Sequence, residues 1–320
     1  MKAYPRIVFY GTPDFAVASL DALVKAGFQV VGVVTAPDKA AGRGLTLSQS
    51  AVKRYALAHQ LPLFQPERLK SPEFQQTLIH LNPDIQVVVA FRMMPKEVWS
   101  LPPLGTFNLH ASLLPQYRGA APINRAIMNG ESETGVTTFF INEEIDTGAI
   151  LLQECMAIGP DETAGELHDR LMTLGATLVV KTVNRMIDET ISPLPQGLGG
   201  KELEPFIMAP KIQKRDTQID WTQDTKKVFN QVRGLNPYPG VYTSIKLKDT
   251  SSLDIKIGSA RMASDASQEH FLPGEVFTDG KRFLKIATSD GFIEILTLQP
   301  ASKKMMRITD FLNGSGTLFV

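Results

Sequence analysis

The sequence of 320 residues holds one cysteine, Cys155, and no long apolar run. A single cysteine cannot form an internal disulfide, which is typical of proteins that work in a reducing cytoplasm. Apolar runs such as VVGVV and VVVA are far too short to cross a bilayer, and the opening MKAYPRIVFYGTPDF lacks the pattern of a signal peptide. These absences predict a cytoplasmic protein without a membrane partner.

The formal net charge is zero, because 33 Lys and Arg balance 33 Asp and Glu. The charges are nevertheless distributed unevenly between the two halves of the sequence. Residues 191–320 carry 17 basic against 14 acidic side chains, and residues 1–190 carry the opposite excess. This excess is a weak signal alone, but it indicates that the C-terminal part meets an anionic partner.

Motifs for metals and nucleotide cofactors are absent as well. The early GTPDF segment lacks the second and third glycines of a dinucleotide fingerprint, and no GxxxxGK[ST] loop occurs. The five histidines and the cysteine show no short metal-ligand spacing. Ser112 has no GxSxG setting, so a hydrolase triad would rest on proximity alone. We therefore expect chemistry without a metal.

The first half of the sequence alternates apolar strands with helices. Strands are predicted for the segments 6–10, 29–35, 84–91, 106–110 and 135–141. A long loop follows the second strand at 36–49, and a long helix at 162–188 closes the series. Fully apolar strands separated by helices predict a doubly wound, mostly parallel α/β sheet.

The second half has a different composition. A stretch rich in Pro, Gly and charge predicts a linker at 191–209 between a first domain, 1–190, and a second domain, 210–320. The second domain reads as one helix at 222–233 followed by five short strands separated by turn residues. This pattern predicts a small β-barrel of the OB-like kind.

Polar side chains gather where the strand 106–110 ends. Asn108 and His110 are two residues apart and therefore point to one face, at the edge where open α/β sheets bind ligands. Asp146, in the turn after the strand 135–141, lies beside His110 if the two strands are neighbours. An Asn–His–Asp set has no nucleophile, but it can polarise a carbonyl and move protons. The simpler alternatives are that His110 is a core histidine whose hydrogen bonds are made within the protein, and that Asp146 forms an Asx turn.

Several segments resemble one enzyme family in the order in which they occur: GTPDFA, AGRG, NLHASLLPQYRGAAPI, ETGVTTF, IDTG and RGLNPYPG. They closely resemble the folate-dependent formyltransferases, in particular those that act on methionyl-tRNA, over nearly the full length. The resemblance implies transfer of a formyl group from 10-formyltetrahydrofolate to the α-amine of methionyl-tRNA, the initiator tRNA of translation. It implies no metal.

The resemblance also implies roles for individual residues. The family's catalytic asparagine, histidine and aspartate fall on Asn108, His110 and Asp146. Its folate-contacting turn falls on Ser112, Leu113, Leu114 and Pro115, and we expect this break in the chain to supply backbone polar groups for the co-substrate. The loop arginine that meets the acceptor end of the tRNA falls on Arg43. In the segment AFRMMP, which departs from the family pattern, we expect Arg92 to be a solvated charge.

Rival interpretations remain open. A formyltransferase for a nucleotide-linked amino sugar or for glycinamide ribonucleotide would keep the same three polar residues, but the AGRG loop and the second domain favour tRNA. A catalytically silent RNA-binding protein is the alternative from another class, and the complete Asn–His–Asp set argues against it. We expect a monomer whose second domain meets tRNA phosphates through basic side chains: Lys281, Arg282, Lys285, Lys303, Lys304 and Arg307.

Overall fold

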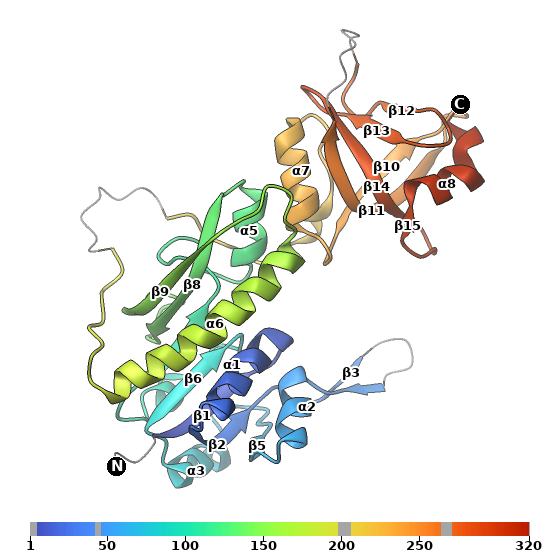
Figure 1. Ribbon diagram of the computed structural model, residues 1–320. Coiled ribbons are helices and arrows are strands. Elements are labelled where there is room, and N and C mark those ends of the chain that lie inside the picture. The colour runs from blue at the N-terminus through green and yellow to red at the C-terminus, as the bar shows by residue number, and fades with distance from the viewer. Residues whose placement is uncertain (1–4, 42–45, 198–205, 264–270, 320) are drawn as a thin grey trace. The chain divides into compact units, whose positions relative to one another are not determined.

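A computed structural model describes residues 5–41, 46–197, 206–263 and 271–319 (Figure 1). The chain forms two compact units. The N-terminal unit comprises Met1–Gly119, Thr134–Met156 and His168–Met208, and the C-terminal unit comprises Ala120–Glu133, Ala157–Leu167 and Ala209–Val320. Two segments of the first half therefore belong to the C-terminal unit, which a single cut in the sequence does not anticipate. The linker at 191–209 stays a prediction.

The N-terminal unit is built on one sheet, whose strand order within the described residues is β5-β2-β1-β6-β7-β8-β9. Its strands are β1 (Arg6–Gly11), β2 (Gln29–Val34), β5 (Leu63–Phe64), β6 (Ile85–Val89), β7 (Thr106–His110), β8 (Glu133–Phe140) and β9 (Ile150–Ala157). Neighbours are parallel from β5 to β7, and the β7–β8 pair is antiparallel. The chain turns outward from β1 to β5 and returns at β6, which confirms the doubly wound, mostly parallel sheet.

Helices cover this sheet because its strands are apolar on both faces. The helices of the unit are α1 (Asp14–Lys25), α2 (Ala51–Ala58), α3 (Pro72–Leu81), α4 (Lys96–Trp99) and most of α6 (Ala164–Ile187). Gly175 lets α6 approach β7 closely, since a Cβ there would lie 2.7 Å from the Leu109 side chain (Figure 1). On the other face Val8 and Tyr10 share one apolar cluster with Phe74 of α3 and Val98 of α4.

Several elements of this unit were not anticipated from the sequence. A hairpin of β3 (Lys39–Ala41) and β4 (Thr46–Ser48) occupies part of the predicted loop 36–49, and the two strands pair antiparallel. Strand β9, at the sheet edge, has one buried residue, Leu151, and from Leu152 onward it alternates half-buried with exposed residues, unlike the apolar interior strands. The interior strands can be recognised in the sequence by their apolar composition, whereas the edge strand β9 cannot.

The C-terminal unit combines helices with a second, antiparallel sheet. Its elements are α5 (Pro122–Met128), the 3₁₀ turn Lys214–Thr217, α7 (Thr225–Gly234), β10 (Val241–Lys246), β11 (Ser252–Ala263), β12 (Val276–Thr278), β13 (Leu284–Ala287), β14 (Phe292–Pro300), β15 (Met306–Arg307), α8 (Ile308–Ser315) and the 3₁₀ turn Gly316–Leu318. The strand order is β10-β11-β14-β13-β12, with β15 on β14. The predicted helix and five strands are present, and the fold class of an α/β core followed by a small OB-like β domain is confirmed.

One buried cation ties α7 to an earlier segment of the same unit. Arg233 is 7% exposed. Its Nε donates to Asn230 Oδ1 at 2.9 Å, and its Nη1 donates to the carbonyls of Gly159 and Glu162 at 3.3 and 3.1 Å. Burial lowers the pKa of the Arg233 guanidinium, and the charges of Asp161 and Glu162 oppose that shift. The RGLNPYPG segment thus begins with a structural arginine.

Arg233→Ala should lower the free energy of unfolding of the C-terminal unit by roughly 2–4 kcal/mol, because one buried and two part-buried acceptors lose a charged donor. Urea unfolding in a Trp99→Phe background reports on this unit through Trp221, whose Nε1 donates to Thr243 Oγ1 at 2.9 Å. Arg282→Ala is the control, since its side chain is 84% exposed and pairs locally with Asp279. Equal stability of the two variants would contradict the structural role.

Candidate active site

The candidate site lies at the carboxyl end of β7. In the sheet Asn108 pairs with Val88 of β6, and His110 pairs with Thr137 of β8. Asn108 and His110 share a face of the strand, and Leu109, which faces α6, points to the other. Asn108 is half-buried and His110 is buried. Both polar side chains therefore stand on the sheet face away from α6, at the end of the strand.

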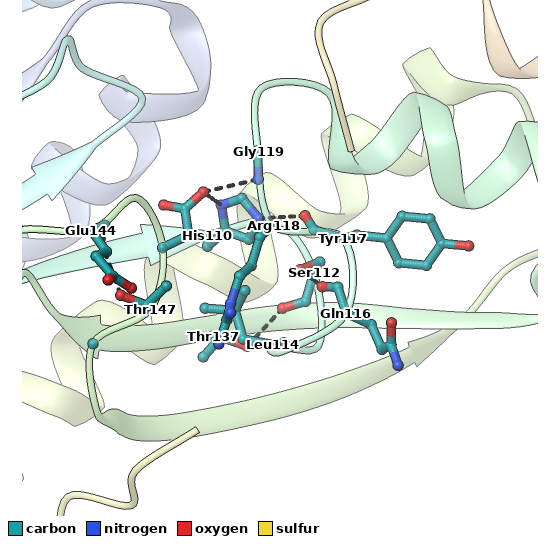
Figure 2. Close-up of polar contacts among 12 residues, drawn as sticks. His110, Ser112, Leu114, Gln116, Tyr117, Arg118, Gly119, Thr137, Glu144 and Thr147 are labelled. Atoms are coloured by element: carbon teal, nitrogen blue, oxygen red, sulfur yellow. Dashed lines mark hydrogen bonds and ion pairs between the residues drawn. The ribbon is translucent and has the colours of Figure 1, made fainter. Parts of the chain in front are cut away.

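The turn after β7 is braced by side chains from the two strands that follow. Thr137 Oγ1 donates to the Ser112 carbonyl at 2.6 Å and accepts from the Leu114 N–H at 3.2 Å. Gln153 Nε2 of β9 donates to the Leu114 carbonyl at 2.8 Å and to Thr137 Oγ1 at 2.9 Å. One hydroxyl thus uses its donor and both of its acceptor positions to hold the turn (Figure 2).

These contacts change the expected chemistry of the segment 112–115. We expected its polar groups to contact folate, yet the Ser112 Oγ donates to the Gln116 carbonyl at 2.7 Å and the Leu113 carbonyl accepts from the Gln116 N–H at 3.1 Å. The Leu114 side chain is 3% exposed, whereas Leu113 and Pro115 are half-buried. Many of the turn's polar groups thus form hydrogen bonds within the protein, and its partly exposed side chains, Leu113 and Pro115, are apolar.

Asp146 is presented by an unusual backbone conformation in the β8–β9 connection. Its φ is +56°, in the left-handed region that a residue with a Cβ seldom adopts. Asn142 Oδ1 shapes the same connection by accepting from the Glu144 N–H at 3.2 Å and from Thr147 Oγ1 at 3.0 Å. Gly148 is required there, because a Cβ would lie 1.7 Å from the Phe140 carbonyl oxygen. Asp146 thus lies in a turn of the connection, in a backbone conformation that the surrounding contacts must hold.

His110 and Asp146 come together across this site. The distance from His110 Nδ1 to Asp146 Oδ2 is 3.9 Å, longer than a hydrogen bond, and the same Oδ2 accepts from the Gly119 N–H at 2.9 Å. His110 Nε2 lies 2.9 Å from the Tyr117 carbonyl oxygen (Figure 2). Because a carbonyl only accepts, Nε2 carries a hydrogen and Nδ1 faces the carboxylate.

The segment Tyr117–Gly119 is held in its place from outside the site. Tyr117 has a φ of +61°, and its N–H donates to the Ile207 carbonyl at 2.6 Å. Gln116 Oε1 accepts from the Ile207 N–H at 2.7 Å. The Arg118 guanidinium lies over the Phe206 ring, 5.0 Å from its centroid. The backbone groups that contact His110 and Asp146 therefore belong to a firmly anchored segment.

The remaining predicted residues lie apart from this cluster or beyond the described structure. Arg92 is exposed, and its guanidinium donates to the carbonyls of Pro66 and Glu67 at 2.5 and 2.8 Å. It is therefore more than a solvated charge, because it joins two connections on the surface of the N-terminal unit. Arg43 falls between β3 and β4, outside the described residues.

Sequence reasoning missed the residues that support the site. Thr137 carried a faint signal, being a polar residue in an apolar strand, while Gln153 lies in the edge strand that was overlooked. Across residues 5–41, 46–197, 206–263 and 271–319, no group of three or more His, Cys, Asp or Glu side chains is placed to hold a metal ion. In the same residues, no helix is long and apolar enough to cross a membrane.

Comparison with known proteins identifies both parts of the chain. Residues 5–183 match the family model of the formyl transferases, and residues 211–316 match that of the formyl transferase C-terminal domain. The chain is 51% identical over 315 residues to the methionyl-tRNA formyltransferase of Azobacteroides pseudotrichonymphae genomovar. CFP2, covering 98% of this chain and 97% of that protein.

Solved structures share the fold at much lower identity. HypX from Aquifex aeolicus in complex with tetrahydrofolic acid has a TM-score of 0.63 at 18% identity, covering 98% of this chain and 48% of that one. An N-formyltransferase from Helicobacter canadensis in complex with folinic acid and dTDP-3-aminofucose has a TM-score of 0.64 at 21% identity, covering 91% and 98%. At these identities the likeness concerns the fold alone.

Thr137→Val should lower the free energy of unfolding by roughly 2–3 kcal/mol, because the Leu114 N–H and the Ser112 carbonyl lose their buried partner. Thr137→Ser keeps the hydroxyl and should retain most of the stability. Thr77→Val on α3 is the matched control, since that exposed hydroxyl contacts only the Glu73 carbonyl of its own helix. A Thr137→Val variant as stable as Thr77→Val would show that the hydroxyl does not brace the turn.

Proposed function

The chain belongs to the formyl transferase family, and we propose that it transfers a formyl group from 10-formyltetrahydrofolate to the α-amine of initiator methionyl-tRNA. The observation that carries this proposal is the extent of the likeness to a methionyl-tRNA formyltransferase, which includes both domains at 51% identity. The structural neighbour in complex with dTDP-3-aminofucose is only 21% identical. The product, N-formylmethionyl-tRNA, serves translation initiation.

The reaction requires stabilisation of charge on the formyl oxygen. When the methionyl amine attacks the formyl carbon, a carbon–nitrogen bond forms and the carbonyl electrons move onto that oxygen. We assign Asn108 to donate to it through its side-chain amide, since preorganised donors at a developing oxyanion lower the barrier most effectively. Its half-buried position at the end of β7 supports the assignment. The bond to the folate nitrogen then breaks, and a proton must travel from the amine to that nitrogen.

We assign His110 and Asp146 to the proton and to the second hydrogen bond. His110 N–H would also donate to the formyl oxygen, and Asp146 would orient the imidazole and help carry the proton from the amine to the leaving nitrogen. The 3.9 Å separation of Nδ1 and Oδ2 is longer than a hydrogen bond, so this orienting contact has to shorten when the substrates bind. Because Nε2 donates to the Tyr117 carbonyl, its use in catalysis requires that contact to open when the substrates bind.

The turn after β7 is our proposed folate contact. Ser112, Leu113, Leu114 and Pro115 form it, next to the catalytic face of the strand. Since the Ser112 and Leu114 carbonyls are already bonded within the chain, we assign apolar contact with folate to the half-buried Leu113 and Pro115 and a supporting role to Leu114. This division differs from the one expected from the sequence, in which backbone polar groups bind the co-substrate.

The C-terminal unit offers basic side chains for the tRNA phosphates. Lys303, Lys304 and Arg307 are exposed around β15, and Lys281 is exposed in the turn between β12 and β13. Arg282 pairs with Asp279 in that turn, with an Nε to Oδ2 distance of 2.7 Å, so part of its charge is neutralised. Several lysines contacting phosphates would release counterions, which makes the affinity depend steeply on salt.

We also propose that the protein is a cytoplasmic monomer. The only cysteine, Cys155, is an exposed free thiol, which a reducing compartment keeps reduced. The expected substrate, charged tRNA, is found in the same compartment. Sedimentation at assay concentrations tests the monomer, since a mass near twice 35.2 kDa would contradict it.

Asn108→Ala, His110→Ala and Asp146→Ala should each lower turnover by roughly 10²–10⁴-fold, because each removes a donor or proton carrier from the transition state. The measurement is formylation of methionyl-tRNA at saturating substrates, with thermal unfolding as the check on folding. His80→Ala serves as the histidine control, since His80 is an exposed residue in the last turn of α3. Near-normal turnover of His110→Ala would remove His110 from the mechanism.

Arg43 separates work on tRNA from work on small acceptors. If its guanidinium contacts the acceptor end, Arg43→Ala should lose about 1–3 kcal/mol of transition-state stabilisation with methionyl-tRNA, the scale of a charged hydrogen bond. Arg43→Lys should recover only part, because Lys lacks the planar fork. The readout is kcat/KM at fixed low salt, with exposed Arg68→Ala as the control. If kcat/KM of the wild type and of all variants agreed within about twofold, Arg43 would have no role in the reaction with methionyl-tRNA.

A further inference from the structure

A glutamine outside both family-model matches is bound to the backbone that presents Asp146. Gln196 follows α6, in the segment whose composition predicts a linker. This segment is fastened to the sheet, because Leu194 and Ile150 exchange two backbone hydrogen bonds of 2.8 and 2.9 Å. Gln196 itself is half-buried. A flexible linker would not form such a pair of backbone hydrogen bonds with the sheet.

The Gln196 side chain uses all of its hydrogen-bonding capacity. Its Nε2 donates to the carbonyls of Asp146 and Gly148 at 2.9 and 2.8 Å. Its Oε1 accepts from Arg118 Nε and Nη2 at 2.9 and 2.5 Å. The reversed amide would set a donor against a guanidinium and an acceptor against two carbonyls, so the network itself fixes which atom is nitrogen.

These contacts join the two loops that meet at the catalytic pair. On one side Gln196 holds Asp146, whose left-handed backbone needs outside support. On the other side it holds Arg118, the residue between Tyr117, whose carbonyl contacts His110 Nε2, and Gly119, whose N–H contacts Asp146 Oδ2. One amide therefore ties both partners of the pair to a common point without touching the pair's side chains.

We propose that Gln196 is a positioning residue for the formyl transfer, which sets the Asp146 carboxylate against His110. The proposal rests on the proposed function of Asp146. Without the amide, two carbonyls and a guanidinium lose their partners, and the 146–148 and 117–119 backbones are no longer held together. Misplacement of a catalytic group by about 1 Å can lower a rate by on the order of 100-fold.

Two substitutions separate the halves of the amide. Gln196→Ala removes both, whereas Gln196→Glu keeps an acceptor for Arg118 but has no N–H for the Asp146 and Gly148 carbonyls. If positioning of Asp146 is the role, both variants should lower kcat by about 10–100-fold, with KM for each substrate within threefold of the wild type. Gln75→Ala is the matched control, since that exposed amide contacts only the Lys70 carbonyl.

A double-substitution cycle distinguishes positioning from a separate contribution. If Gln196 acts through Asp146, adding Gln196→Ala to Asp146→Ala should lower kcat by less than about twofold further, because the group being positioned is already gone. A loss of kcat in the double variant equal to the product of the two single losses would overturn the proposal. So would a normal kcat in both Gln196 variants, a change confined to KM, or loss of cooperative folding in both, which would make Gln196 a purely structural residue.

Hydrogen–deuterium exchange gives a readout that does not depend on activity. The Gly119 N–H is protected by Asp146 Oδ2. Gln196→Ala should therefore speed exchange of a peptide covering 113–121 by about tenfold, as Asp146→Ala should, while Gln75→Ala leaves it unchanged. Unchanged exchange in folded Gln196→Ala would overturn the proposal. Wild-type protein that fails to formylate methionyl-tRNA would instead overturn the proposed function, and exchange alone would then decide the role of Gln196.

Discussion

The Gly119 N–H donates to the Asp146 carboxylate, and the arrangement of the site depends on this contact. The contact leaves the carboxylate 3.9 Å from His110 Nδ1, close enough for charge to matter and too far for a hydrogen bond. It also links two connections that follow different strands. Together with the Gln196 amide, it fixes the turn that holds Asp146 against the segment that follows β7, at whose end His110 lies.

The rest of the N-terminal unit can be understood as support for that contact. The β7–β8 ladder sets His110 opposite Thr137, and the Thr137 hydroxyl shapes the turn that leads to Gly119. Gln196 and Ile207 hold the same segment from the chain beyond α6. Before any substrate arrives, His110 Nε2 already donates to the Tyr117 carbonyl and Asp146 Oδ2 already accepts from the Gly119 N–H. Substrate binding must then exchange contacts rather than create them, which keeps the resting geometry well defined.

The interior strands, the long helix and the Asn108–His110 pair could all be predicted, because burial on both faces and a two-residue spacing leave direct marks in a sequence. The division into two units could not, since the segments around Ala120–Glu133 and Ala157–Leu167 join the C-terminal unit through packing that no local pattern encodes. Gln196 was equally hidden. A glutamine in a Pro- and Gly-rich stretch reads as solvent-exposed, and its partners lie 48, 50 and 78 residues earlier in the chain. Local signals indicate the candidate reacting groups, while the contacts that hold the backbone around them are set by tertiary structure.

The most direct test is the single-turnover rate of formylmethionyl-tRNA formation by the wild type and by Asp146→Asn. The asparagine keeps an oxygen for the Gly119 N–H and nearly the same shape, so it removes the charge and little else. We predict formylation by the wild type and a rate at least about 100-fold lower in the variant, with unchanged thermal unfolding. A variant within about threefold of the wild type would contradict the assignment of the reaction to the His110–Asp146 pair.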